Sequence, residues 1–147
     1  MSYWDASALF KLYIAEPDSA DFAGLAAALP EPMSTSAIAA PELLCAFHRR
    51  QRERALHSLG APALYRQFCT DCEEGEIVVV PYGTGVIEEA ERLVRLAFGQ
   101  PQPVMIRALD LIHLASAIVS KADVLVTTDD PLRHLAAMAG VPVLPKR

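Results

Sequence analysis

The stretch DVLVTTDDPLRHLAAMAG, residues 123–140, joins a strand pattern directly to a helix pattern. Its first part, DVLVTT, is an apolar, β-branched run that predicts a strand over residues 123–128. The second part predicts a helix, because Pro131 suits the first helical position. We expect Asp130 to be the N-cap before it, which leaves Asp129 without a structural explanation. A strand that leads straight into a helix is typical of α/β folds.

Strand and helix patterns alternate along the rest of the chain. Further strands are expected at residues 2–5, 32–36, 76–82 and 141–145. Helices are expected at residues 7–14, 18–29, 40–56, 62–73, 87–98 and 108–121. Such alternation indicates an α/β layer fold in which helices cover a mostly parallel sheet. Ligands in folds of this kind bind beyond the carboxyl ends of the strands.

The composition is that of an ordinary folded protein. The chain has 147 residues, 52% hydrophobic and 21% charged, and we expect a single domain over residues 1–147. No apolar run is long enough to cross a membrane, and the first residues lack a basic targeting segment. Three cysteines, an odd number, agree with a reducing compartment. We therefore expect a cytoplasmic protein that does not act at a membrane.

Four acidic residues stand where strands end or helices begin, namely Asp5, Glu42, Asp110 and Asp129. The net charge of −5 counts at first against a nucleic-acid partner. If these four carboxylates bind cations, however, the rest of the surface carries a net charge of only about −1. Local basic stripes are then compatible with the composition.

A cluster of these acids would need positive charge between them. Two carboxylates about 4 Å apart repel by about 4 kcal/mol at an effective dielectric constant of 20. Mg²⁺ or Mn²⁺, which prefer octahedral shells of oxygen ligands, suit a site made of carboxylates and water. Such ions activate water and neutralise charge on a phosphodiester. The acids therefore indicate a site for Mg²⁺, with Mn²⁺ as the alternative ion.

Asp110 stands in an almost wholly apolar stretch, RALDLIHLASAIV, residues 107–119. Because burying an uncompensated charge is costly, the carboxylate needs an explanation. It could lie at the start of the helix, pair with a buried base such as Arg107 one turn back, or hold a cation together with other carboxylates. His113, one turn beyond Asp110, is either a packed core histidine or a residue that approaches the site. The sequence leaves these alternatives open.

Four segments together resemble the PIN domain family, and more closely the VapC-type toxin ribonucleases. They are YWDASALFKLYIAE (3–16), STSAIAAPELLCAFHRR (34–50), RALDLIHLASA (107–117) and VLVTTDDPL (124–132). The resemblance implies a three-layer α/β/α fold with a mostly parallel sheet of four to five strands. Two features depart from the family pattern: Trp4 stands where a smaller aliphatic residue is common, and Pro41 directly precedes Glu42.

The same resemblance carries expectations about function. It implies that Asp5, Glu42, Asp110 and Asp129 are the catalytic and metal-binding acids. It also implies that Ser7 and Thr127 are supporting hydroxyl residues. The expected activity is that of a metal-dependent endoribonuclease, which leaves 5′-phosphate and 3′-hydroxyl ends. The expected partners are RNA, a cognate antitoxin protein and a second copy of the chain.

Basic residues provide candidate RNA contacts. The stretch HRRQRER, residues 48–54, is either the solvated face of a helix or a set of phosphate contacts. Arg49 lies seven residues after Glu42 and therefore on the same helical face. Lys11 and Arg107 are further candidates. For a homodimer, the helices near 7–29 and 40–56 are the expected surface.

Other functions fit the sequence less well. Cys69 and Cys72, or Cys45 and His48, have zinc-like spacing, but each pair falls in an expected helix, and buried small hydrophobic residues explain the cysteines better. A non-catalytic PIN-like RNA-binding or scaffold domain is one alternative to a nuclease. An α/β phosphotransfer domain is another, although the first strand offers a single Asp. The phosphate-binding glycine motifs of nucleotide-binding proteins are absent from the sequence.

Overall fold

The computed structural model describes residues 1–30, 32–53 and 60–146, which contain five strands and seven helices. The strands are β1 (Ser2–Trp4), β2 (Met33–Ser36), β3 (Ile77–Val80), β4 (Val124–Val126) and β5 (Val143–Leu144). The helices are α1 (Ala6–Tyr13), α2 (Ser19–Ala28), α3 (Ala39–Arg52), α4 (Ala61–Glu73), α5 (Thr84–Phe98), α6 (Ala108–Val119) and α7 (Asp130–Met138). No helix among these residues is long and apolar enough to span a membrane.

The five strands form one fully parallel sheet in the order β3-β2-β1-β4-β5. The chain winds outward from β1 in one direction through β2 and β3, and in the other direction through β4 and β5. The strand order therefore reverses between β1 and β4. In sheets of this kind, a crevice opens at the reversal point, beyond the carboxyl ends of the strands.

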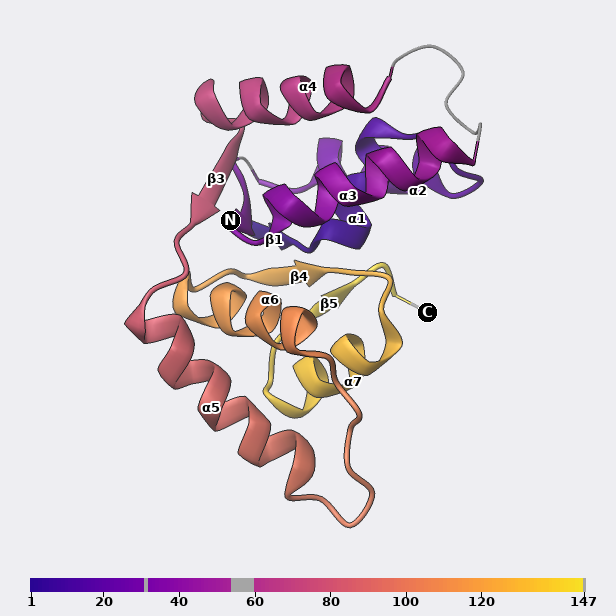
Figure 1. Ribbon diagram of the computed structural model, residues 1–147. Coiled ribbons are helices and arrows are strands. Elements are labelled where there is room, and N and C mark those ends of the chain that lie inside the picture. Colours follow the sequence, from indigo (N-terminus) through magenta and orange to yellow (C-terminus); the bar gives the residue numbers. More distant parts are fainter. Residues whose placement is uncertain (31, 54–59, 147) are drawn as a thin grey trace.

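Helices cover both faces of the sheet (Figure 1): α1–α4 lie on one side, and α5, α6 and α7 on the other. Successive strand residues face opposite layers, as the pleat requires. In β1, Tyr3 packs in the cluster with α5–α7, whereas Trp4 packs in the cluster with α1–α4. In β4, Leu125 and Val126 divide in the same way. The expected three-layer α/β/α fold with a parallel sheet is confirmed.

The expected helices and strands are all present, with small shifts at their ends. The helix expected from residue 87 begins at Thr84, because Gly83 in an extended conformation already serves as its N-cap. Residues 54–56 of the helix expected at 40–56 lie outside the described part of the chain. The cysteines are not the buried small residues expected from the sequence: Cys45 is exposed, and Cys69 and Cys72 are partly buried.

The start of α7 corrects the prediction about its cap. Asp129, not Asp130, is the N-cap, and its Oδ1 accepts a hydrogen bond from the backbone N–H of Leu132 at 2.9 Å. Asp130 is the first helical residue, and Pro131 is the second. Proline is tolerated anywhere in the first turn, so its position does not fix the cap to a single residue. Asp129 therefore has a structural role that the sequence did not indicate.

Candidate functional site

A cleft of about 750 Å³ opens beyond the carboxyl ends of β1 and β4, where the strand order reverses. All four acids singled out from the sequence, Asp5, Glu42, Asp110 and Asp129, line it. Its other charged or hydroxyl-bearing lining residues are Ser7, Lys11, Glu16, Arg49, Arg50, Glu53, Arg107, His113, Thr128 and Asp130. Acidic residues from four different parts of the chain thus line the same cleft as several basic side chains.

Asp5 is the most buried of the four acids, with 2% of its surface exposed. It directly follows β1 and is the N-cap of α1, because its Oδ1 accepts from the Ala8 N–H and from the Ser7 hydroxyl, both at 2.8 Å. Its Oδ2 accepts from the Thr127 hydroxyl at 2.5 Å. Burial raises the pKa of the Asp5 carboxyl above its usual value, whereas these hydrogen bonds act in the opposite direction.

Thr127 connects Asp5 to Asp129. It follows β4 and is fully buried, and its Oγ1 donates to Asp5 while accepting from the Asp129 N–H at 3.1 Å. Ser7 adds a second link, because its Oγ accepts from the hydroxyl of Thr128 at 2.9 Å. The two hydroxyl residues singled out from the sequence, Ser7 and Thr127, therefore hold the end of β1 against the segment that follows β4.

Asp110 is the third residue of α6 and makes no N-cap hydrogen bond. Its Oδ2 accepts from Nε of Arg107 at 2.6 Å. The explanation that it pairs with a base one turn back is thus realised, but the base is not buried: 76% of the Arg107 side chain is exposed, against 11% of Asp110. Burial raises the pKa of Asp110, and the pair with Arg107 acts against this shift.

Glu42 lies in the first turn of α3, on the layer opposite α6. Pro41 precedes it as the third helical residue, a position where the missing N–H breaks no intrahelical bond, so the helix continues undisturbed. Oε2 of Glu42 lies 2.7 Å from Nε2 of His113. His113 is 1% exposed. It is therefore both a core residue and a contact of the acidic cleft.

The four carboxylates suit a hard divalent cation, which prefers oxygen ligands, and one of them, on Asp5, accepts hydrogen bonds from two hydroxyl groups. In the part of the chain that the structure describes, no three acidic, His or Cys side chains stand close enough to hold a metal ion as they lie. Arg107 also donates from Nη2 to Oδ2 of Asp129 at 3.2 Å and so spans Asp110 and Asp129. A cation held by both Asp110 and Asp129 would have to displace this guanidinium.

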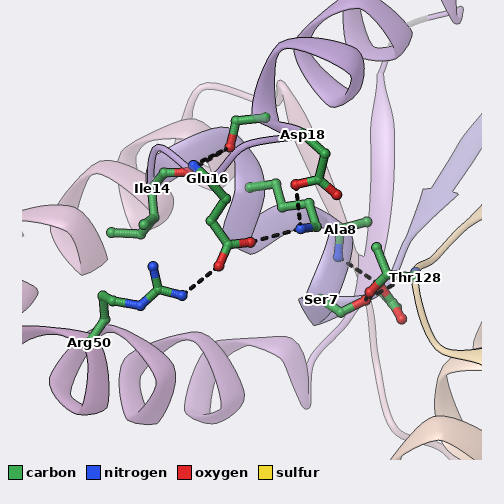
Figure 2. A network of polar contacts seen from close by, with 10 residues as sticks. Ser7, Ala8, Ile14, Glu16, Asp18, Arg50 and Thr128 are labelled. Carbon is green, nitrogen blue, oxygen red and sulfur yellow. Dashed lines mark hydrogen bonds and ion pairs between the residues drawn. The ribbon is translucent and has the colours of Figure 1, made fainter. Parts of the chain in front are cut away.

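The basic residues divide into paired and unpaired ones. Nζ of Lys11 lies 2.7 Å from both Glu16 and Asp18, and Arg50 contacts Glu16 at 2.5 Å. Figure 2 shows Arg50 of α3 pointing to Glu16, which lies in the segment that joins α1 to α2. The contact between Ser7 and Thr128 is a separate one in the same view. Lys11, expected to contact RNA, is thus engaged by two carboxylates.

Arg49 differs from these bases. It is exposed, lines the cleft, and forms no ion pair with any residue in the described ranges. Arg49 is therefore the base of the cleft that is most available to an anionic ligand. Of the groups at the cleft, sequence reasoning missed the pairing of Lys11 and Arg50 with Glu16. The approach of His113 to the site was one of two alternatives that its one-turn spacing from Asp110 left open, but its partner Glu42 was not predicted.

A family model described as PIN domain matches residues 2–138. The chain belongs to the PIN domain family. PIN domains are generally nucleases that use divalent metal ions. A comparison with curated proteins finds no match.

Solved structures agree with the family at the level of the fold. The structure of FitAB bound to an IR36 DNA fragment superposes with a TM-score of 0.71 at 18% identity, covering 98% of this PIN domain chain and 94% of that one. VapBC2 from Rickettsia felis bound to a promoter DNA fragment gives 0.69 at 15% identity, with all of both chains covered. A toxin-antitoxin complex from Klebsiella pneumoniae gives 0.64 at 15% identity, covering 99% and 97%.

Proposed function

We propose that this PIN domain is a Mg²⁺-dependent endoribonuclease that hydrolyses RNA phosphodiester bonds, with Mn²⁺ able to replace Mg²⁺. One observation carries the proposal: Asp5, Glu42, Asp110 and Asp129 line a single cleft beyond the carboxyl edge of the sheet. Four acids at one hollow offer the oxygen ligands that these ions require. Membership of a family of nucleases supports the same reaction.

The acids and the hydroxyl residues of the cleft have different roles in the proposed reaction. Asp5, Glu42, Asp110 and Asp129 would hold the metal, which supplies an activated water and neutralises charge on the phosphate. Ser7 and Thr127 hold Asp5 by the hydrogen bonds described above, so that its carboxylate is oriented before RNA binds.

Basic residues at the cleft would bind the RNA backbone. Arg49 contacts it through phosphate, which gives affinity without sequence choice. Arg107, released from Asp110 and Asp129 when the metal binds, provides a second contact of this kind. Lys11 can contribute only by leaving Glu16 and Asp18.

The biological role that we propose is that of a toxin, held inactive by a cognate antitoxin protein and acting in the cytoplasm as one domain over residues 1–147. The similarity in fold to a chain of a toxin-antitoxin complex supports this role. Packing of both helical layers on one sheet supports the single domain.

We also propose a homodimer. The large exposed apolar side chains of the described residues do not lie on the helices near 7–29 and 40–56. They lie on β3, α5, α6 and the segments next to them, and Ile87, Val94 and Phe98 share one face of α5. Sedimentation of the wild type and of Val94→Glu tests this face. A monomeric wild type at micromolar concentration contradicts the dimer, and a dimer that survives Val94→Glu excludes α5.

Cleavage of labelled RNA tests the reaction. Purified protein should cut RNA when Mg²⁺ or Mn²⁺ is added, EDTA should stop the reaction, and Asp5→Asn should abolish it while still binding RNA. Binding without cleavage by the wild type would favour the scaffold alternative. Labelling by acetyl phosphate would favour phosphotransfer, an outcome that the burial of Asp5 opposes.

A further inference from the structure

His113, on α6, contacts residues of two other elements, β1 and α3. Its Nε2 lies 2.7 Å from Oε2 of Glu42 in α3, and its Nδ1 lies 2.8 Å from the hydroxyl of Tyr3 in β1. Tyr3 is fully buried, and the two rings meet edge to face with centroids 5.9 Å apart. Both ring nitrogens of a buried histidine are thus committed to specific partners.

The partners determine where the protons lie. The carboxylate of Glu42 can only accept, so Nε2 of His113 is the donor in that bond. Nδ1 of a neutral imidazole then accepts from the hydroxyl of Tyr3. The hydroxyl of Tyr3 carries its own proton and can donate it to Nδ1. The chain of donors runs from Tyr3 through His113 to Glu42.

These two hydrogen bonds fix the flexible side chain of Glu42 by linking residues from the two helical layers. Glu42 comes from α3, whereas His113 follows Asp110 by one turn on α6. A free glutamate loses side-chain rotamer entropy when it is ordered, which opposes metal binding. The bond to His113 holds one carboxylate oxygen, and within the described residues the other, Oε1, accepts no hydrogen bond. The free oxygen therefore stays available at the cleft on a side chain that is already ordered.

We propose that His113, itself oriented by Tyr3, is the positioning residue that holds Glu42 in place for the metal. The inference rests on the proposed metal site and assigns His113 a function beyond core packing. Residues that hydrogen-bond to a metal ligand, and so orient it, commonly contribute 10- to 100-fold to metal affinity. A substitution of His113 should therefore change metal affinity only by changing the position of Glu42.

Metal affinity measured by calorimetry with Mn²⁺ tests the role of His113. His113→Leu should weaken Mn²⁺ binding about 10- to 100-fold. His113→Gln, which places an amide N–H near the position of Nε2, should restore binding to within about threefold. Leu114→Ala is the control for lost packing, because Leu114 is a fully buried apolar residue next to His113 on α6. It should bind Mn²⁺ like the wild type.

A double-mutant cycle separates positioning from packing. In a Glu42→Gln background, His113→Leu should weaken Mn²⁺ binding by less than about twofold, because the group it positions is already changed. An equal loss in both backgrounds, or a loss matched by Leu114→Ala, would overturn the proposal. If His113→Leu fails to fold, Tyr3→Phe replaces it, since this change removes one oxygen. A Tyr3→Phe protein with wild-type Mn²⁺ affinity would then count against the chain of donors.

The tautomer gives a readout that needs no metal. Long-range ¹H–¹⁵N spectra should show His113 with a proton on Nε2 and none on Nδ1, and Glu42→Gln should alter the Nε2 signal. A proton on Nδ1 of the neutral ring would overturn the inference whether or not Mn²⁺ binds. If the tautomer is as stated but the wild-type protein binds no Mn²⁺, the proposed metal site fails and the positioning role fails with it. Normal Mn²⁺ binding by both wild type and His113→Leu removes the positioning role alone.

Discussion

Nε of Arg107 donates a hydrogen bond to Oδ2 of Asp110 at 2.6 Å, and the same guanidinium reaches across to Oδ2 of Asp129 at 3.2 Å. An exposed cation thus stands between two acids that would otherwise repel each other. It supplies from within the chain the positive charge that a cluster of carboxylates requires. In the proposed enzyme, a divalent ion and Arg107 compete for these two carboxylates.

Removing Arg107 should therefore favour the metal. Because its side chain is mostly exposed, we expect Arg107→Ala to lower the free energy of unfolding of the metal-free protein by about 1 kcal/mol or less. Mn²⁺ affinity, measured by calorimetry, should rise about three- to tenfold, which corresponds to about 0.6–1.4 kcal/mol. Arg92→Ala is the matched control, since Arg92 forms a similar exposed pair with Glu89 on α5. Weaker Mn²⁺ binding by Arg107→Ala would contradict the competition.

Two substitutions at Asp129 separate its structural role from its proposed metal role. Asp129→Asn keeps an oxygen that can accept from the Leu132 N–H, whereas Asp129→Ala does not. We expect the Asn variant to unfold near the wild-type temperature and the Ala variant to lose about 1 kcal/mol of stability. Both should bind Mn²⁺ at least tenfold more weakly. An Asn variant with full affinity would show that Asp129 is a helix cap and no more.

Arg49 should contribute to RNA binding through charge. In an Asp5→Asn background, where RNA is bound but not cut, Arg49→Ala should weaken binding several-fold. The salt dependence of the binding constant should become shallower by about 0.7 in the log–log slope, the contribution of one phosphate contact to single-stranded nucleic acid. Arg52→Ala, on the same helix but outside this cleft, is the control. Equal effects of the two changes would assign Arg49 to the general charge of α3.

The features that the sequence predicted depend on neighbours along the chain. The β-branched run in DVLVTT and the apolar periods of the helices are local, and they gave the parallel α/β architecture. The placement of Asp5 directly after a strand was equally local, because a strand end and a helix cap are adjacent in the chain. The one-residue error at Asp129 is of the same kind, since either of the two aspartates that precede Pro131 satisfies the pattern for a cap.

The features that the sequence did not predict depend on distance in the chain. Glu42 and His113 are separated by 71 residues, and only the packing of α6 against the sheet brings them together. An apolar helix with one histidine does not show what that histidine faces. The pairing of Lys11 with Glu16 and Asp18 is closer in sequence, but it depends on the turn between α1 and α2, which composition does not specify.

The substitution Asp110→Asn tests the remaining alternatives for Asp110. Since Asp110 makes no N-cap hydrogen bond, the change removes no cap. It loses the charge that Arg107 pairs with, but it also relieves the repulsion from Asp129. Because these effects oppose each other, we expect the metal-free protein to change in stability by less than about 1 kcal/mol. RNA cleavage should fall at least 100-fold.

Melting with and without Mn²⁺ distinguishes a ligand from a residue that only pairs with Arg107. At a Mn²⁺ concentration 100 times the wild-type Kd, binding stabilises the wild type by about 2.7 kcal/mol. If Asp110→Asn weakens binding 100-fold, the same concentration stabilises it by only about 0.4 kcal/mol. Asp21→Asn, an exposed acid in the first turn of α2, should keep the full effect. A full Mn²⁺ effect together with near wild-type cleavage in Asp110→Asn would leave Asp110 as the partner of Arg107 alone.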